Sequence, residues 1–594
     1  MSDEKASIFN RLRRLQEHNL SLIPAMMMQK AMNSFSLQEE PAPEEAIGQV
    51  SVVVYPQDPF VSGPEVRRMN ARDIQPGLVN ARVRIQDSAG EAAQPDSEGN
   101  YLYWPGTREF DQINCFYYVT FTLRMYERYA RRLLPWSFPA LRITVDPHSG
   151  AGANAFYNEQ DRLLGFHSFQ LSDETISAAQ SADIVSHETA HAILDGLRDL
   201  YNESFGLGPT AFHEAFGDMS AMLVALHDDS LISRVLDWTG GNLRLDNFIS
   251  VVGEHLTERL RMMPEVNTRT IYLRNALNKL QQLAFDSLSY AADDPETQLT
   301  RESHNYSRLF SGAFYDILVG IYERLAQQVN PRIAVHRARD IVGYLLTCAV
   351  ELGPVGEFGF ADMAKAFLAA DLTLNDGNYI NIMTEVFHQR GILHASEAKS
   401  WVHELRALPD VRLPDSINSA MTSAMFLQEK VVSALKLPTD VEFIPMSAYR
   451  NAAGNAYLTY FTHRRMTLQG PQFLQFDGSN IDLFGGLSLM FDSGGFLRSA
   501  FYRPVTDEDM RQIRILTAEL IHLGLVASSA NKVPLPLPLH LHEVQPKGLW
   551  LPNPPFADTA PAPGQSRLVK FPVIFDTFPR HISDFWSYLK AWKK

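Results

Sequence analysis

Residues 187–191 read His-Glu-Thr-Ala-His, and this short segment constrains the fold more than any other feature of the chain. On a helix, His187 and His191 project from one face, because residues four apart lie about one turn apart. Two imidazoles at that separation can share one tetrahedral metal ion, and Glu188 beside them can reach a bound water. The same five residues also fit an ordinary solvated helix, so the surrounding sequence must decide between the two interpretations.

A third candidate ligand follows in the segment HEAFGDMSAMLVAL. Glu214 opens a second stretch of helical apolar periodicity, and Asp218 lies one turn further along the same face. Glu214 would provide the third metal bond, and the Asp218 carboxylate would hold one ligand imidazole. Two histidines and one glutamate leave one coordination position for water, which is typical of a catalytic zinc site.

Composition excludes several other classes of protein. The chain has 594 residues, 45% of them hydrophobic, which predicts a globular protein of two to four domains. A formal net charge of −15 and the lack of any basic block argue against nucleic acid as a partner. Cys115 and Cys348 are the only cysteines, so a disulfide framework is excluded.

The N-terminal residues MSDEKASIFNRLRR do not resemble a signal peptide. The longest apolar stretches, such as IVGYLLTCAV, are about half the roughly 20 residues that a membrane-spanning helix needs. We therefore expect no membrane span and a cytoplasmic location, with non-classical export left open.

Changes in composition and periodicity divide the chain into five parts. An N-terminal helix and an acidic linker come first, followed by a strand-rich part that ends in the helix of His187. A helical part, an additional α+β domain of unknown role and a proline-rich tail follow. The boundaries are 1–48, 49–200, 201–393, 394–530 and 531–594.

With Glu214 as third ligand, the sequence resembles the thermolysin-like zinc metallopeptidases, over roughly residues 105–393. NAFYN at 154–158 is similar to the edge-strand motif that binds substrate backbone in that family. The resemblance implies this role for Asn154 and Ala155. It also implies one zinc per chain, with Glu188 accepting a proton from water and passing it to the leaving amine.

Three further segments match the family in the expected order. YNES at 201–204 resembles the loop whose tyrosine contacts the transition state, which implies that role for Tyr201. HNYSRLFSGAFY makes His304 the second transition-state donor. LRN resembles the Leu-Arg pair whose arginine, here Arg274, holds the substrate carbonyl.

We expect an α+β fold. The resemblance implies a two-lobed thermolysin-like domain, strand-rich and then mostly helical. The change in composition after residue 393 predicts a separate α+β C-terminal domain, which the resemblance does not cover. The resemblance also implies a zinc-dependent endopeptidase acting on peptide or protein substrates. Ile184 and Leu273 occupy positions that line the pocket beyond the cut bond. We therefore expect a large apolar residue on the amine side of the cut.

The chain departs from the family in several places. It shows no signal peptide and no long pro-region. Asp183 stands where the family places a calcium ligand, but Ala225 replaces the expected glutamate partner, so calcium is left open and the usual double site is expected to be incomplete. TRESH replaces the usual residues before His304, so Glu302 either orients His304 or is solvated.

Two alternatives belong to other functional classes. The chain could be a zinc-binding scaffold or toxin component of peptidase fold whose function resides in the C-terminal domain, which would then contact a protein partner. The retention of Glu188, Tyr201 and His304 argues against it. A non-peptidase zinc hydrolase is the second alternative, and the NAFYN motif argues against that.

Overall fold

The computed structural model describes most of the chain from Gly48 onward. The described residues are 48–200, 204–254, 257, 259, 272–290, 297–414, 417 and 425–522, with the backbone of 526–527, 541–544, 567–570 and 574–576. The expected N-terminal helix and acidic linker lie outside these ranges. Among the described residues, no helix is both long enough and apolar enough to cross a membrane.

The N-terminal part is built on a six-stranded mixed sheet of order β17-β5-β6-β4-β3, with β7 paired to β6. Strand β4 runs parallel to β3 and β6, whereas β5 and β7 run antiparallel to β6. A hairpin of β1 (Gln49–Val54) and β2 (Glu65–Asn70) precedes the sheet. The strands of the sheet are β3 (Val83–Ile85), β4 (Ile143–Ala151), β5 (Ala155–Asn158), β6 (Leu163–Leu171), β7 (Glu174–Ser177) and β17 (Ile574–Asp576).

One long helix, α3 (Arg108–Ala130), packs against this sheet. The aromatic periodicity of the sequence predicts a helix from residue 116, but the helix begins earlier. The side chain of Thr107 caps it by accepting a hydrogen bond from the backbone nitrogen of Phe110. This cap and the acidic residues Glu109 and Asp111 of the first turn favour a helix that starts at Arg108.

The central layer is helical and contains both predicted ligand helices, α4 (Ala182–Leu197) and α6 (Leu207–Ala225). Ser181 caps α4 by accepting a hydrogen bond from the backbone nitrogen of Ile184. Helix α6 approaches α4 closely at Gly217, where a Cβ atom would lie 2.5 Å from the ring of His187. The other helices are α7 (Asp229–Thr239), α9 (Ser303–Ala326), α10 (Pro331–Leu352), α11 (Phe360–Asn375), α12 (Ile380–Gln389) and α13 (Ala395–Arg406).

A second large sheet forms the C-terminal part, in the order β10-β11-β12-β16-β15-β14, with β13 paired to β12. The turn sequences DGSN and DSGG precede β12 and β13. Helix α15 (Asp507–His522) follows them. The strands are β10 (Ile444–Arg450), β11 (Ala456–Thr467), β12 (Asn480–Phe491), β13 (Leu497–Arg503), β14 (Val526–Ala527), β15 (Leu541–Val544) and β16 (Arg567–Lys570).

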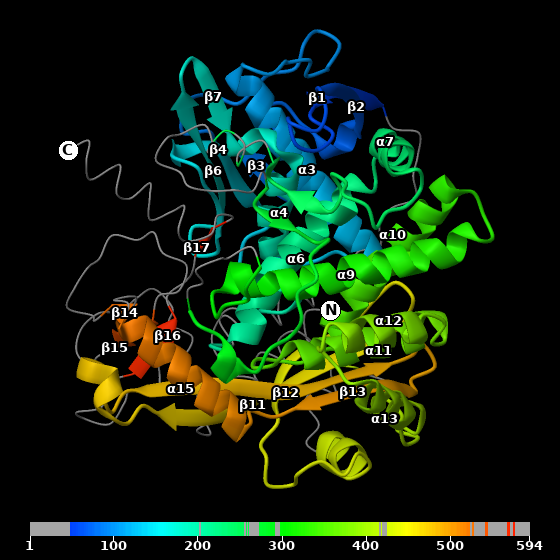
Figure 1. Ribbon diagram of the computed structural model, residues 1–594, viewed down its shortest axis with the longest axis vertical. Coiled ribbons are helices and arrows are strands. Elements are labelled where there is room, and N and C mark those ends of the chain that lie inside the picture. Colours follow the sequence, from blue (N-terminus) through cyan, green and yellow to red (C-terminus); the bar gives the residue numbers. More distant parts are fainter. Residues whose placement is uncertain are drawn as a thin grey trace, which may run out of the picture.

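The helical layer lies between the two sheets, with β4, β6 and β7 at the top of Figure 1 and β11 to β13 at the bottom. Helices α10, α11 and α13 contact the strands of the C-terminal sheet. A short pair of strands, β8 (Val251–Val252) and β9 (Arg274–Asn275), brings Arg274 to the face of α6 and α9. The prediction of a mixed α+β fold is confirmed, whereas a thermolysin-like division into lobes stays a prediction.

The expected boundary at residue 394 does not coincide with a break in packing. Helix α13 starts directly after it and packs against α11 and α12. The largest hydrophobic cluster includes four residues of the C-terminal sheet, Tyr449, Tyr457, Met490 and Phe501. Helices and sheet thus share apolar contacts, and whether residues 394–530 fold alone stays a prediction.

Candidate metal centre

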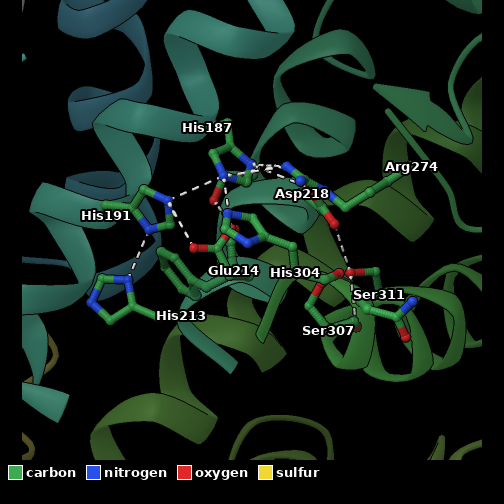
Figure 2. Close-up of polar contacts among 12 residues, drawn as sticks. His187, His191, His213, Glu214, Asp218, Arg274, His304, Ser307 and Ser311 are labelled. Atoms are coloured by element: carbon green, nitrogen blue, oxygen red, sulfur yellow. Dashed lines mark hydrogen bonds and ion pairs between the residues drawn. The ribbon is translucent and has the colours of Figure 1, made fainter. Parts of the chain in front are cut away.

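The two histidines of α4 face each other at the centre of the helical layer (Figure 2). Their Nε2 atoms lie 3.1 Å apart and their rings are nearly perpendicular, at 89°. Two nitrogens that bind one zinc ion at tetrahedral geometry lie about 3.3 Å apart. The separation of His187 and His191 therefore matches that of two ligands of a single metal ion.

Glu214 of α6 brings the third donor to the same point. Its Oε2 atom lies 3.5 Å from Nε2 of His187, and its Oε1 atom lies 3.9 Å from Nε2 of His191. One donor atom from each of the three residues lies within 4.8 Å of the others, and all three side chains are buried. Nitrogen and carboxylate donors without a thiolate fit a zinc-type ion, with one position left for another ligand.

The pKa shifts of His191 and Glu214, two of the three residues, suit metal binding. Burial holds the pKa of His191 well below its ordinary value, and the positive charges of neighbouring histidines act in the same direction. Burial opposes ionisation of Glu214, but the charges of nearby histidines outweigh it and lower that pKa. Burial and Arg274 act to lower the pKa of His187, yet hydrogen bonds to Asp218 and Glu214 raise it. A neutral His191 and an ionised Glu214 are the metal-binding forms.

Asp218 lies where the sequence predicts it, beside a ligand imidazole. Its Oδ1 atom lies 3.2 Å from Nδ1 of His187 and accepts a 2.6 Å hydrogen bond from Nε of Arg274. Its Oδ2 atom accepts a hydrogen bond from Ser311 of α9 at 3.1 Å. These contacts fix the carboxylate on three sides, so it can hold the His187 ring in one orientation.

Arg274 and Glu188 are both buried in the site. Arg274 is 4% exposed and Glu188 is fully buried. Burial opposes the positive charge of Arg274, but Asp218, Glu214 and then Glu188 raise its pKa. The guanidinium therefore lies in the field of all three carboxylates and remains charged.

His304 enters the site from the first turn of α9. Its Nε2 atom lies 3.4 Å from Oε2 of Glu214, and its Nδ1 atom lies 2.5 Å from Oε1 of Glu302. Glu302 also caps α9 by accepting from the backbone nitrogens of His304 and Asn305. Of the two roles considered for Glu302, the contact with His304 favours orientation of the imidazole.

The negative charges of Glu214 and Glu302 keep His304 protonated. Burial acts to lower the pKa of His304, but the charges of Glu214 and Glu302 raise it to about 10. Burial likewise opposes ionisation of Glu302, and the charge of His304 lowers that pKa to about 2. His304 is thus a hydrogen-bond donor at neutral pH.

The NAFYN segment, expected to bind substrate backbone, contains strand β5, and its substrate-binding role stays a prediction. Ala155 is the first residue of β5, and the carbonyl of Asn154 accepts from the backbone nitrogen of His167 on β6 at 2.9 Å. The other edge of β5 pairs with β17, residues 574–576, which the sequence did not predict. Tyr201, the other expected transition-state donor, lies outside the described residues.

The two residues expected to form an apolar pocket, Ile184 and Leu273, do not line the space beside the metal centre. A narrow space, too small to hold a water molecule, lies beside Arg274 and Asp218, and Arg308 and Ser311 also line it. Its lining residues do not include Ile184, which is fully buried, or Leu273. The assignment of these two residues to a substrate pocket therefore stays a prediction.

Sequence reasoning missed His213 and Asp195. Nδ1 of His213 lies 2.8 Å from Nδ1 of His191, and Nε2 of His213 lies 2.9 Å from Oδ1 of Asp195. Two signals were available: His213 directly precedes Glu214, and Asp195 lies four residues after His191 on one helix face.

No protein-family model matches the chain, and no curated protein matches it. The function must therefore be inferred from the geometry and chemistry of the site. The buried group of His187, His191 and Glu214 is the strongest starting point for that inference.

Proposed function

We propose that the chain is a zinc-dependent endopeptidase that resembles thermolysin. The observation that carries the proposal is the convergence of His187, His191 and Glu214 from two helices, with Glu188 buried in the same turn of α4. A site with three protein ligands leaves a position for a reactant, which suits catalysis better than structural support. The strand-rich part before α4 and the helices after it support a thermolysin-like arrangement.

The three ligands would hold one zinc ion. When bound, zinc would supply a Lewis acid that polarises a peptide carbonyl and lets water lose a proton near neutral pH. Glu188 would accept that proton as water attacks the carbonyl carbon, and would then deliver it to the leaving amine. Asp218 would keep the His187 imidazole in place through both steps.

Two cationic groups would meet the charge that develops on the substrate. Protonated His304, held by Glu302, would donate a hydrogen bond toward the carbonyl oxygen of the cleaved bond. Arg274 would hold a neighbouring substrate carbonyl. Donors fixed before the reaction stabilise the transition state without reorganising, which supports assigning this role to buried, paired groups.

The substrate would be an extended peptide. The backbone of Asn154 and Ala155 at the edge of the N-terminal sheet would pair with it, as strands add to sheet edges in many peptide complexes. We propose a preference for a large apolar residue on the amine side of the cut, assigned to Ile184 and Leu273.

Replacing Glu188 by glutamine tests the chemistry separately from metal binding. The amide cannot accept a proton, so Glu188→Gln should lower kcat by about 10²-fold or more while zinc content stays near one per chain. Zinc is measured by elemental analysis and turnover by mass spectrometry of a digested peptide library, with and without a chelator. Glu404→Gln, the same change at an exposed position of α13, is the matched control.

Three results would contradict the proposal. Wild-type protein purified without added metal could contain no zinc, or His191→Ala could contain as much zinc as wild type. Alternatively, Glu188→Gln could cleave peptides within a few-fold of the wild-type rate, which would show that another base operates.

A further inference from the structure

His191 has a second polar contact on the side that faces away from the metal ligands. Its Nε2 atom lies toward His187, whereas its Nδ1 atom lies 2.8 Å from Nδ1 of His213 (Figure 2). The Nε2 atom of His213 lies 2.9 Å from a carboxylate oxygen of Asp195. None of these three side chains is more than 2% exposed.

Metal binding would fix every proton along this chain of contacts. A metal on Nε2 of His191 requires the ring proton to sit on Nδ1, because a neutral imidazole carries only one. That N–H would donate to Nδ1 of His213, which must then be an acceptor. His213 therefore carries its own proton on Nε2 and donates it to the Asp195 carboxylate.

We propose that His213 and Asp195 are positioning residues that hold His191 in the tautomer and orientation required for metal binding. This inference rests on the proposed function. A carboxylate at the end of the relay favours the proton positions that leave Nε2 of His191 free to bind a metal. Imidazole ligands whose other nitrogen is held in this way bind metals more tightly.

The placement of the residues supports a shared role. Asp195 lies one helical turn beyond His191 on α4, and His213 lies beside Glu214 on α6. The relay therefore connects the two helices that supply the metal ligands. His187 has its own partner in Asp218, so each ligand imidazole is held by a different carboxylate, one directly and one through His213.

Metal affinity and metal spectra test the relay without depending on peptidase activity. His213→Phe keeps a ring of similar size but cannot accept from His191, and we expect its zinc dissociation constant to rise about 10- to 100-fold. His213→Asn should bind zinc within a few-fold of wild type, because its amide oxygen can still accept from His191. Asp195→Asn keeps an acceptor without the charge and should give an intermediate value.

Zinc affinity is measured by chelator competition, and the visible spectrum of the cobalt(II) form reports the ligand geometry. We expect an altered cobalt spectrum for His213→Phe and a wild-type spectrum for His213→Asn. His227→Phe, at a half-buried histidine after α6 and outside the site, is the control and should change neither readout. The two polar variants keep the test open if His213→Phe does not fold.

Two results would overturn the relay alone: a His213→Phe variant with wild-type affinity and spectrum, or a folded His213→Asn variant as weak as His213→Phe. The second result would mean that the site needs the volume of the ring and not its hydrogen bond. A wild-type chain that binds neither zinc nor cobalt would instead overturn the proposed function, and the relay with it.

Discussion

At the scale of single residues, the centre of this molecule consists of buried ionisable groups. Glu214, Asp218, Arg274 and His304 are each at most 4% exposed. Each lies within 4 Å of an oppositely charged partner. Burying an ion costs several kcal/mol unless a partner compensates, so a cluster of this kind indicates a functional site.

A second buried group of carboxylates predicts how stability depends on pH. Asp58, Asp183 and Glu254 have donor atoms within 4.8 Å of one another. Burial, and then the charge of Asp58, raise the pKa of Asp183 and of Glu254 well above their ordinary values. An acid with a raised folded-state pKa contributes stability below its unfolded pKa and loses it as pH rises through the folded value.

We therefore expect the free energy of unfolding of metal-free protein to fall as pH rises above about 4, and to fall less in Asp183→Asn. The variant, which carries no charge there, should therefore be the more stable protein at pH 7. Urea unfolding in a chelating buffer at several pH values measures this. Asp410→Asn, at an exposed position, should follow wild type.

The same experiment tests whether calcium binds near Asp183, which the sequence leaves open. Added calcium should stabilise wild type more than Asp183→Asn, because the ion would offset the repulsion between ionised carboxylates. An equal response of the two proteins would contradict calcium binding there. If the free energy of unfolding of wild type and of Asp183→Asn depends on pH in the same way in chelating buffer, the predicted effect of buried charge is contradicted.

Residue-level prediction succeeded where the relevant contacts are local in sequence. His187 and His191, and Glu214 and Asp218, are each one helical turn apart, so periodicity alone places them on common faces. The contact between His213 and His191 depends on how α4 crosses α6. No periodicity in either segment encodes that crossing. The sequence positions of His213 and Asp195 make them candidates, and the contact between the two helices is seen in the structure.

At the scale of elements, the site depends on the close approach of α4 and α6. Gly217 of α6 faces the ring of His187, and a Cβ atom there would lie 2.5 Å from two ring atoms. Oδ1 of Asp218, the next residue, lies 3.2 Å from Nδ1 of the same ring. The ring therefore cannot move aside without losing its partner.

We expect Gly217→Ala to lower both stability and zinc affinity. Forcing an extra methyl group into a packed interior costs about 1–3 kcal/mol, so zinc affinity should fall about tenfold or more. Gly320→Ala on α9 is the matched control, since a Cβ there meets one atom, the Cγ2 methyl of Ile382 at 2.8 Å, and no side chain of the metal centre. It also gains the helix propensity of alanine, about 1 kcal/mol.

Chelator competition and thermal unfolding distinguish the two variants. The packing argument fails if Gly217→Ala binds zinc as tightly as Gly320→Ala does. Equal losses in both variants would show that the substitution acts on the helices in general and not on His187.

At the scale of elements, some helices carry clear sequence signals at their ends. Glu302 before α9 and Asn330 before Pro331 of α10 are such signals, and the helices begin there. The proline-rich composition of residues 531–594 predicts a tail outside the folded domains. Strands within it instead join both sheets, because a strand acquires its partners from distant segments that local sequence does not specify.

At the scale of the whole molecule, the C-terminal sheet and the helical layer share buried polar contacts. The guanidinium of Arg198 donates to the carbonyl of Glu351 at 2.9 Å and to the hydroxyls of Thr459 and Ser488 at 3.2 and 3.3 Å. Tyr449 donates to a carboxylate oxygen of Glu351 at 2.9 Å. These contacts lead us to expect that residues 1–406 alone do not form a stable fold.

Expression of residues 1–406 beside residues 1–530 tests this expectation. The shorter chain should lack a cooperative thermal transition, whereas the longer one retains β10 to β13 and α15 and should unfold cooperatively. A cooperative transition and bound zinc in residues 1–406 would instead support the separate C-terminal domain expected from composition.

The end of the chain reaches the strand assigned to substrate binding. Strand β17 pairs antiparallel with β5, with Ile574 opposite Asn158, Phe575 opposite Tyr157 and Asp576 opposite Phe156. Figure 1 shows β17 beside the N-terminal sheet, far in sequence from its other strands. A strand can pair with one neighbour on each of its two sides. One side of β5 pairs with β6, so β17 and a substrate peptide would compete for the other side.

We therefore expect a chain that ends at Phe571, and so lacks β17, to cleave peptides with a several-fold higher kcat/KM. The tethered segment has a high effective concentration, so its removal should act mainly by lowering the apparent KM. A chain that ends at Arg580 retains β17 and should match wild type. A synthetic peptide of residues 571–580 should inhibit the shortened enzyme competitively. Unchanged kinetic constants in the shortened enzyme, together with no inhibition by the peptide, would mean that substrate does not use this edge of β5.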